Sequence, residues 1–218
     1  PVGEVVRGST GMTQGAGTPS AAINFVRKRP TADFQASVQG QLGSWNHRGL
    51  QLDVSGPLNA AGSVRGRAVA HGWDSDSFQD VAGEGRKLLY LIGEVDLGRR
   101  TLLTLSLAHQ RNDSNTTYSG LPTAPDGSDL KLPRSTYLGN QWNYWDDTNT
   151  SVFATLEHRF DNGWKANFST LHIQGEQNKF VSGVYLNGAA YDLTGLKAFN
   201  GNDRTSYDLH AAGPFEAF

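Results

Sequence analysis

The stretch LYLIGEVDLGRRTLLTLSL, residues 89–107, contains the clearest hairpin pattern in the chain. Apolar and polar side chains alternate in two runs, one on each side of a turn at Gly98 and Arg99. The polar positions of the first run include Glu94 and Asp96. The apolar positions are Leu89, Leu91, Val95, Leu97, Leu103, Leu105 and Leu107. A period of two is typical of β-strands that present one face to an apolar environment, so the stretch predicts an antiparallel hairpin.

The same alternation recurs on both sides of this hairpin, with connections that alternate in length. Short connections are expected at 58–62, 98–100 and 161–163, and long loops at 74–86, 110–148 and 176–203. Outer-membrane barrels have short turns at one end and long loops at the other, whereas a soluble antiparallel sandwich has no reason to sort its loops in this way. We therefore expect an all-β chain whose residues 34–218 form about eight antiparallel strands in one curved sheet.

Composition agrees with a strand-rich fold and excludes several classes of protein. Gly accounts for 26 of the 218 residues, well above the average usage of roughly 7%. The net charge of −2 and the lack of a dense Lys/Arg run give no reason to expect a nucleic-acid partner. No apolar run approaches the ~18 residues that a membrane helix needs, although a barrel strand needs only about 9–11.

No motif for an enzyme or a metal site is present. The chain has no Cys, and its six His residues are scattered without an i, i+4 pair. The Gly-rich segment near residues 8–19 lacks the Gly-Lys-Ser/Thr of a phosphate-binding loop, and no Gly-x-Ser-x-Gly elbow occurs. We expect no enzyme activity, no resident metal and no cofactor.

The opening segment EVVRGSTGMTQGAGTPSAAINFVRKRP, residues 4–30, resembles the end of the plug domain in TonB-dependent siderophore receptors. The positions that match the family pattern are Arg7-Gly8, Gly15, Gly17, Pro19, Ile23-Asn24, Val26 and Lys28-Arg29-Pro30. Residues 43–70, 119–146 and 153–167 are similar to the branch that takes up coprogen, other ferric hydroxamates and ferric pyoverdine. The resemblance departs from the family at Ser20-Ala21-Ala22, where Gly-Gly or Pro-Gly is frequent.

This resemblance implies that residues 1–30 are the C-terminal part of a plug and that residues 31–218 are the first strands of a transmembrane barrel. Such barrels reach about 22 strands, so about eight of them are expected here. The implied protein is a receptor of the bacterial outer membrane that binds a ferric siderophore and imports it. Its energy would come from the TonB-ExbB-ExbD complex, through an N-terminal segment outside these residues. A passive porin-type barrel, which the plug motif disfavours, and a soluble β-sandwich binding module remain the alternatives.

The resemblance also implies ligand contacts from the plug loop and from aromatic side chains of the long loop. The candidates are Arg7, Met12, Gln14, Tyr118 and Trp142. A guanidinium can donate forked hydrogen bonds to a siderophore's oxygens, and aromatic faces suit a bulky ferric complex. Alternatively, Arg7 is a structural strut between plug and barrel, and the aromatic residues belong to the girdle at the membrane interface.

The polar phase of the strands predicts contacts between plug and barrel. Glu94, Asp96 and Glu157 fall on this phase, so we expect them to face the lumen, where Arg7, Arg27 or Arg29 could pair with them. Lumen water could solvate the carboxylates instead. Residues 1–30 should then lie on the concave side of the sheet, and the leucines of residues 89–107 should face lipid on the other side.

Overall fold

The computed structural model describes residues 2–7 and 21–215, with side chains from Val26 onward, and this part of the chain consists of strands, turns and loops. Ten strands follow one another: β1 (Val2–Arg7), β2 (Ala21–Val26), β3 (Gln35–Leu42), β4 (Arg48–Pro57), β5 (Val64–Asp76), β6 (Gly83–Asp96), β7 (Thr101–Ser114), β8 (Tyr144–Arg159), β9 (Lys165–Asn187) and β10 (Ala190–Ala212). Within these ranges no helix is long and apolar enough to cross a membrane.

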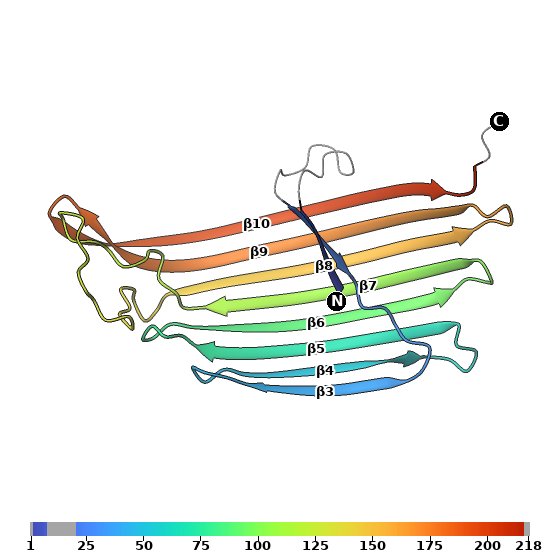
Figure 1. The fold of residues 1–218 in the computed structure, drawn as a ribbon, viewed down its shortest axis with the longest axis horizontal. Coiled ribbons are helices and arrows are strands. Elements are labelled where there is room, and N and C mark those ends of the chain that lie inside the picture. The colour runs from blue at the N-terminus through green and yellow to red at the C-terminus, as the bar shows by residue number, and fades with distance from the viewer. Residues whose placement is uncertain (1, 8–20, 216–218) are drawn as a thin grey trace.

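Strands β3 to β10 form one antiparallel sheet in which each strand pairs with its neighbours in sequence (Figure 1). The sheet is curved, with the short β4–β5, β6–β7 and β8–β9 turns at one end (Figure 1). The long β7–β8 loop lies at the other end, together with the short β3–β4, β5–β6 and β9–β10 connections, so the expected separation of short turns from long loops holds only in part. The expected single sheet of eight antiparallel strands is therefore confirmed. Because the described strands do not form two sheets packed face to face, the soluble β-sandwich alternative is wrong.

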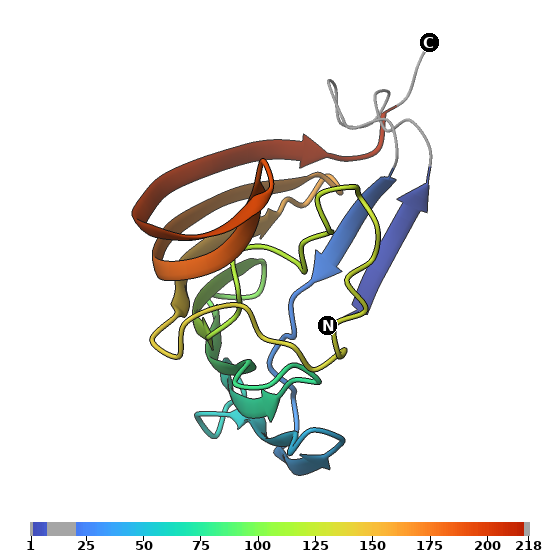
Figure 2. The ribbon, with the colours of Figure 1, turned by 90° about the vertical axis from the view of Figure 1, so that its left-hand side faces the viewer.

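Strands β1 and β2 pair with each other as a separate antiparallel hairpin, from Val2 opposite Val26 to Arg7 opposite Ala21. Figure 2 shows this hairpin on the concave side of the curved sheet, where the resemblance led us to expect it. The pattern of alternation did not predict β1. The expected domain boundary at residue 30 falls in the segment between β2 and β3, and the division into plug and barrel domains stays a prediction.

The long loop expected at residues 176–203 is wrong. Strands β9 and β10 continue through this region, with 23 residues each, and join at Gly188, whose φ of +63° suits a tight turn. The error has a physical reason, because strands that extend beyond a membrane need no apolar face and so lose the alternation that reveals them. The other two long connections are shorter than expected, at residues 77–82 and 115–143.

The two faces of the sheet differ as the alternation predicts. Leu91, Leu97 and Leu105 are 39%, 53% and 50% exposed on the convex face, whereas Glu94 is only 5% exposed on the concave face. Other buried polar residues lie on the same concave side, under the segment that follows β2: Asp53, Ser55, Thr104 and Thr155. The sheet is therefore apolar outside and polar inside, which is the arrangement of a barrel wall.

Candidate functional site

A polar row crosses four neighbouring strands on the concave face. Arg65 of β5 lies opposite Glu94 of β6, which lies opposite Thr104 of β7 and then Thr155 of β8. The row arises because side chains two residues apart on a strand share a face, so the polar phases of adjacent strands meet in register. It offers carboxylate and hydroxyl acceptors to any cation that enters the lumen.

Arg29, in the segment after β2, supplies such a cation. Its Nε donates to Oε1 of Glu94 at 2.6 Å, and its Nη2 lies 3.5 Å from Oγ1 of Thr104. The same Nη2 lies 3.7 Å from Oε1 of Glu157, a longer and more exposed pairing. Arg29 thus joins the N-terminal segment to three strands of the sheet, β6, β7 and β8.

A second ionic contact lies two strands from β6, at Asp53 of β4. Lys28 Nζ donates to Asp53 Oδ2 at 2.8 Å, and Arg67 grips the same carboxylate with Nε at 2.8 Å and Nη2 at 2.7 Å. Arg67 Nη1 also donates to the carbonyl oxygen of Arg29 at 3.0 Å. The forked Arg67 contact orients the carboxylate toward Lys28, since a bidentate guanidinium pair has a fixed geometry.

Neutral contacts reinforce these ionic ones. The Tyr90 hydroxyl donates to the carbonyl oxygen of Lys28 at 3.0 Å, and the backbone N–H of Thr31 donates to Ser55 Oγ at 2.9 Å. The Arg27 guanidinium lies 4.0 Å from the centre of the Phe153 ring, within the range of a cation–π contact. Residues 27–31 are therefore held to the sheet at nearly every position.

The predicted residues divide into those that the structure brings together and those that it does not. Arg29, Glu94 and Glu157 meet, and Arg27 reaches the same concave face at Phe153. Among the described side chains, Asp96 pairs with Arg65 of the adjacent strand, which donates to both of its oxygens at 2.7 and 2.9 Å, and not with residues 26–31.

Sequence reasoning missed Lys28, Asp53, Arg67 and Tyr90 as contact residues. All three sheet residues occupy the polar phase of their strands, which was the available signal. That signal could not tell which of the polar side chains lies beneath the segment.

The loop at residues 115–143 is fastened to β9 through buried polar groups. Ser182 and Asn143 are 1% and 3% exposed, and the Ser182 N–H donates to Oδ1 of Asn143 at 3.0 Å. Asn143 Nδ2 in turn donates to the carbonyl oxygen of Thr116 at 3.1 Å. Burial raises the pKa of Tyr137, and its hydroxyl donates to the Asn115 carbonyl oxygen at 2.8 Å. These hydrogen bonds hold the loop in a defined conformation against β9.

The two predicted aromatic residues lie at opposite ends of this loop. Trp142 stacks on Phe180 of β9 with ring centres 4.3 Å apart, and Tyr118 lies 6.5 Å from the Tyr185 ring. Each is 48% exposed, so each keeps one face open to solvent. Arg7 ends β1, but its side chain lies outside the described part, and so do Met12 and Gln14 entirely. In the described part, no group of three or more His, Asp or Glu side chains is arranged to hold a metal ion.

No protein-family model matches the chain. It is nevertheless 39% identical, over 99% of its length, to the ferric-pyoverdine BN7/BN8 receptor of Pseudomonas putida. It is 36% identical over 98% of its length to the ferripyoverdine receptor of Pseudomonas aeruginosa. The chain spans 27% of the length of each of these relatives.

A solved structure carries the same likeness into three dimensions. The crystal structure of the outer-membrane ferripyoverdine receptor of Pseudomonas aeruginosa, bound to ferripyoverdine, matches 99% of this chain with a TM-score of 0.93 and 34% identity. The match covers 30% of that receptor. Sequence and backbone fold thus agree over nearly the whole chain, and the chain belongs to the TonB-dependent siderophore receptors, of whose plug-and-barrel fold it carries a portion.

Proposed function

We propose that this chain serves in a bacterial outer-membrane receptor that binds a ferric siderophore of the pyoverdine type at the cell surface and imports it. The observation that carries the proposal is the 0.93 TM-score against the ferripyoverdine receptor over nearly the whole chain, at 34% identity. Iron enters as part of the ligand and not as a resident cofactor. A passive porin-type barrel needs an open lumen. The contacts of Arg29 and Lys28 hold the N-terminal segment against the concave face, so they argue against this alternative.

We assign the work of import to the TonB-ExbB-ExbD complex. Moving residues 27–31 separates Arg29 from Glu94 and Lys28 from Asp53. The free energy of these ionic contacts is therefore part of what the complex must supply. Each carboxylate keeps a sheet partner when this happens, Arg65 for Glu94 and Arg67 for Asp53. The sheet can therefore release the segment without leaving a buried carboxylate unpaired, which would be costly.

We assign the ligand contacts to Arg7, Met12 and Gln14 of the N-terminal segment and to Tyr118 and Trp142 of the long loop. The half-exposed rings of Tyr118 and Trp142 support this assignment, because a ring fixed on one face and open on the other can pack against a bulky complex without further ordering.

Calorimetric titration of the full-length receptor with ferric pyoverdine tests this assignment. Trp142→Ala should weaken binding by roughly 5- to 30-fold, as expected for a loss of about 1–2 kcal/mol. Arg7→Ala should weaken it by roughly 10- to 150-fold, because a hydrogen bond to a charged group contributes about 1.5–3 kcal/mol. Trp164→Ala is the control, since Trp164 lies at the short β8–β9 turn, at the opposite end of the sheet. Unchanged affinity in both test variants would remove these residues from the site.

A further inference from the structure

Three glycines lie side by side across the sheet. Gly56 of β4 is opposite Gly66 of β5, and Gly66 is opposite Gly93 of β6. Each adjoins a residue that contacts the N-terminal segment on the concave side: Ser55, Arg67 and Glu94. Because successive residues of a strand point to opposite faces, the three glycines belong to the convex face. There the Leu58 side chain packs over Gly66 and Phe34 lies against Gly56, so Gly93 is the open position of the three.

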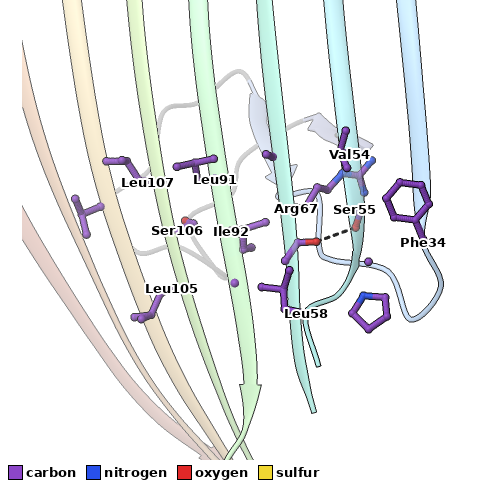
Figure 3. Close-up of a pocket in the computed structure, with 16 residues that line it drawn as sticks. Phe34, Val54, Ser55, Leu58, Arg67, Leu91, Ile92, Leu105, Ser106 and Leu107 are labelled. Carbon is purple, nitrogen blue, oxygen red and sulfur yellow. Dashed lines mark hydrogen bonds between the residues drawn. The ribbon is translucent and has the colours of Figure 1, made fainter. Parts of the chain in front are cut away.

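Apolar residues line a groove beside Gly93. One side is formed by Val54, Ala68, Leu91 and Leu107, which lie opposite one another on neighbouring strands, and Leu58 lies on the other side. Phe34 and Leu105 close its two ends (Figure 3). The result is a groove of about 740 Å³ with an apolar lining on the convex side.

The backbone does not require glycine at all three positions. None of the three has a positive φ, so no turn or bulge explains them. A Cβ on Gly56 would lie 3.0 Å from the Cα of Phe34, so close packing accounts for that glycine. A Cβ on Gly93 would meet only the Arg65 carbonyl oxygen, at 3.8 Å, which is an ordinary contact. Glycine in a strand interior weakens the strand, and it often marks a site where a ligand approaches the backbone closely. We therefore read Gly93 as leaving room for a ligand on the convex face.

We propose that the groove holds one acyl chain of an outer-membrane phospholipid. The inference rests on the membrane placement proposed above but is independent of which ligand the receptor imports. The groove is continuous with the exposed leucines of the convex face, and its charged lining residue, Arg67, directs its guanidinium to Asp53 on the other side. The outer face of a membrane barrel contacts the hydrocarbon chains of lipids, so we infer that such a chain occupies the groove. Lipid chains and the convex face are equally apolar, so the hydrophobic effect does not favour one lipid position over another. Close packing inside the groove then determines which lipid is retained.

Native mass spectrometry of the purified full-length receptor, in mild detergent with added phosphatidylethanolamine, tests the proposal. The unmodified receptor should retain one phospholipid under a detergent wash that removes the others. Gly93→Leu should fill the groove and lose this lipid. Gly40→Leu is the matched control, because a Cβ at Gly40 meets nothing within 4 Å and its partner Leu50 lies on the same exposed face outside the groove. Gly93→Val, with a residue that strands favour, provides a second test if the leucine variant does not fold.

Retention of the lipid by both Gly93 variants would overturn the proposal, and so would its loss from Gly40→Leu as well. A dimer of the unmodified receptor that Gly93→Leu abolishes would also overturn it, since a second copy would then occupy the groove. Titration of each variant with ferric pyoverdine separates the two proposals. Binding should be unchanged in every variant, and failure of the unmodified receptor to bind would count against the proposed function alone.

Discussion

At the scale of single residues, the pairing of Arg29 with Glu94 connects the N-terminal segment to the wall. Glu94 is nearly buried, with a side chain only 7% exposed, while the Arg29 side chain is 49% exposed. Arg65 Nη2 also lies 3.4 Å from Glu94, so the carboxylate has one partner from the segment and one from the sheet. Removal of Arg29 therefore leaves Glu94 paired with Arg65, and it destabilises the protein less than leaving a buried carboxylate unpaired would. Solvent also screens part of the Arg29–Glu94 contact.

Arg29→Ala should loosen residues 27–31 without unfolding the sheet. We expect the opening of this segment to become easier by about 1–2 kcal/mol, which is the range for a charged hydrogen bond after solvent screening. Hydrogen exchange at the Thr31 amide, which donates to Ser55, should accelerate roughly 5- to 30-fold in the full-length receptor.

Arg48→Ala is the matched control for this prediction. Arg48 pairs with Asp74 at 2.9 Å, but the two side chains are 74% and 58% exposed, so the pair contributes little. Equal exchange at Thr31 in the two variants would mean that Arg29 does not hold the segment.

At the scale of elements, the buried Asn143 is one of the residues that hold the long β7–β8 loop to β9. Asn143 connects Ser182 of β9 with Thr116 at the start of the loop. Asn143→Ala leaves the buried Ser182 N–H without this acceptor, at a cost of about 1–3 kcal/mol. We expect faster proteolysis within residues 115–143 and weaker binding of ferric pyoverdine. Asn178→Ala, at an exposed position of the same strand β9, should change neither; equal effects of both variants would refute the anchoring role.

Strand β7 provides a test of which face meets lipid. Leu107 lies opposite Leu91 on the convex face, and Ala108 lies opposite Tyr90 on the concave face. Leu107→Lys should destabilise folding into lipid vesicles by up to about 2–4 kcal/mol, because a lysine there enters hydrocarbon. Ala108→Lys, at nearly the same depth, should cost much less. Urea titrations in vesicles measure both, and a greater cost for Ala108→Lys would reverse the assigned faces.

The elements also mark how far the sequence alone could reach. The hairpin at residues 89–107 was predictable because one of its faces must be apolar, and the structure keeps its phase, with Glu94 inside and Leu91 outside. Strands β9 and β10 were partly missed because residues 176–203 lack a clean alternation of apolar and polar side chains. The partners of the N-terminal segment were only partly predictable, since Asp53, Glu94 and Asp96 look alike in sequence and only the pairing register separates them.

At the scale of the whole molecule, the sheet corresponds to part of a barrel wall, and the N-terminal hairpin lies on its inner side. The convex face is aliphatic, the concave face is polar, and the hairpin lies inside the curve (Figure 2). This arrangement suits a receptor that is closed at rest, because residues 27–31 contact five neighbouring strands of the wall, β4 to β8, at once. Under the function proposed above, external work opens a path through the wall, so we expect import to depend on TonB.

Uptake of radioactive iron tests this account most directly. Cells that lack their own pyoverdine receptors would express the full-length receptor and be given ferric pyoverdine labelled with radioactive iron, with and without a functional TonB. The account predicts that iron accumulates inside cells with TonB, and that cells without TonB bind the label at the surface but do not accumulate it. Equal accumulation in the two strains, or no binding in either, would contradict it.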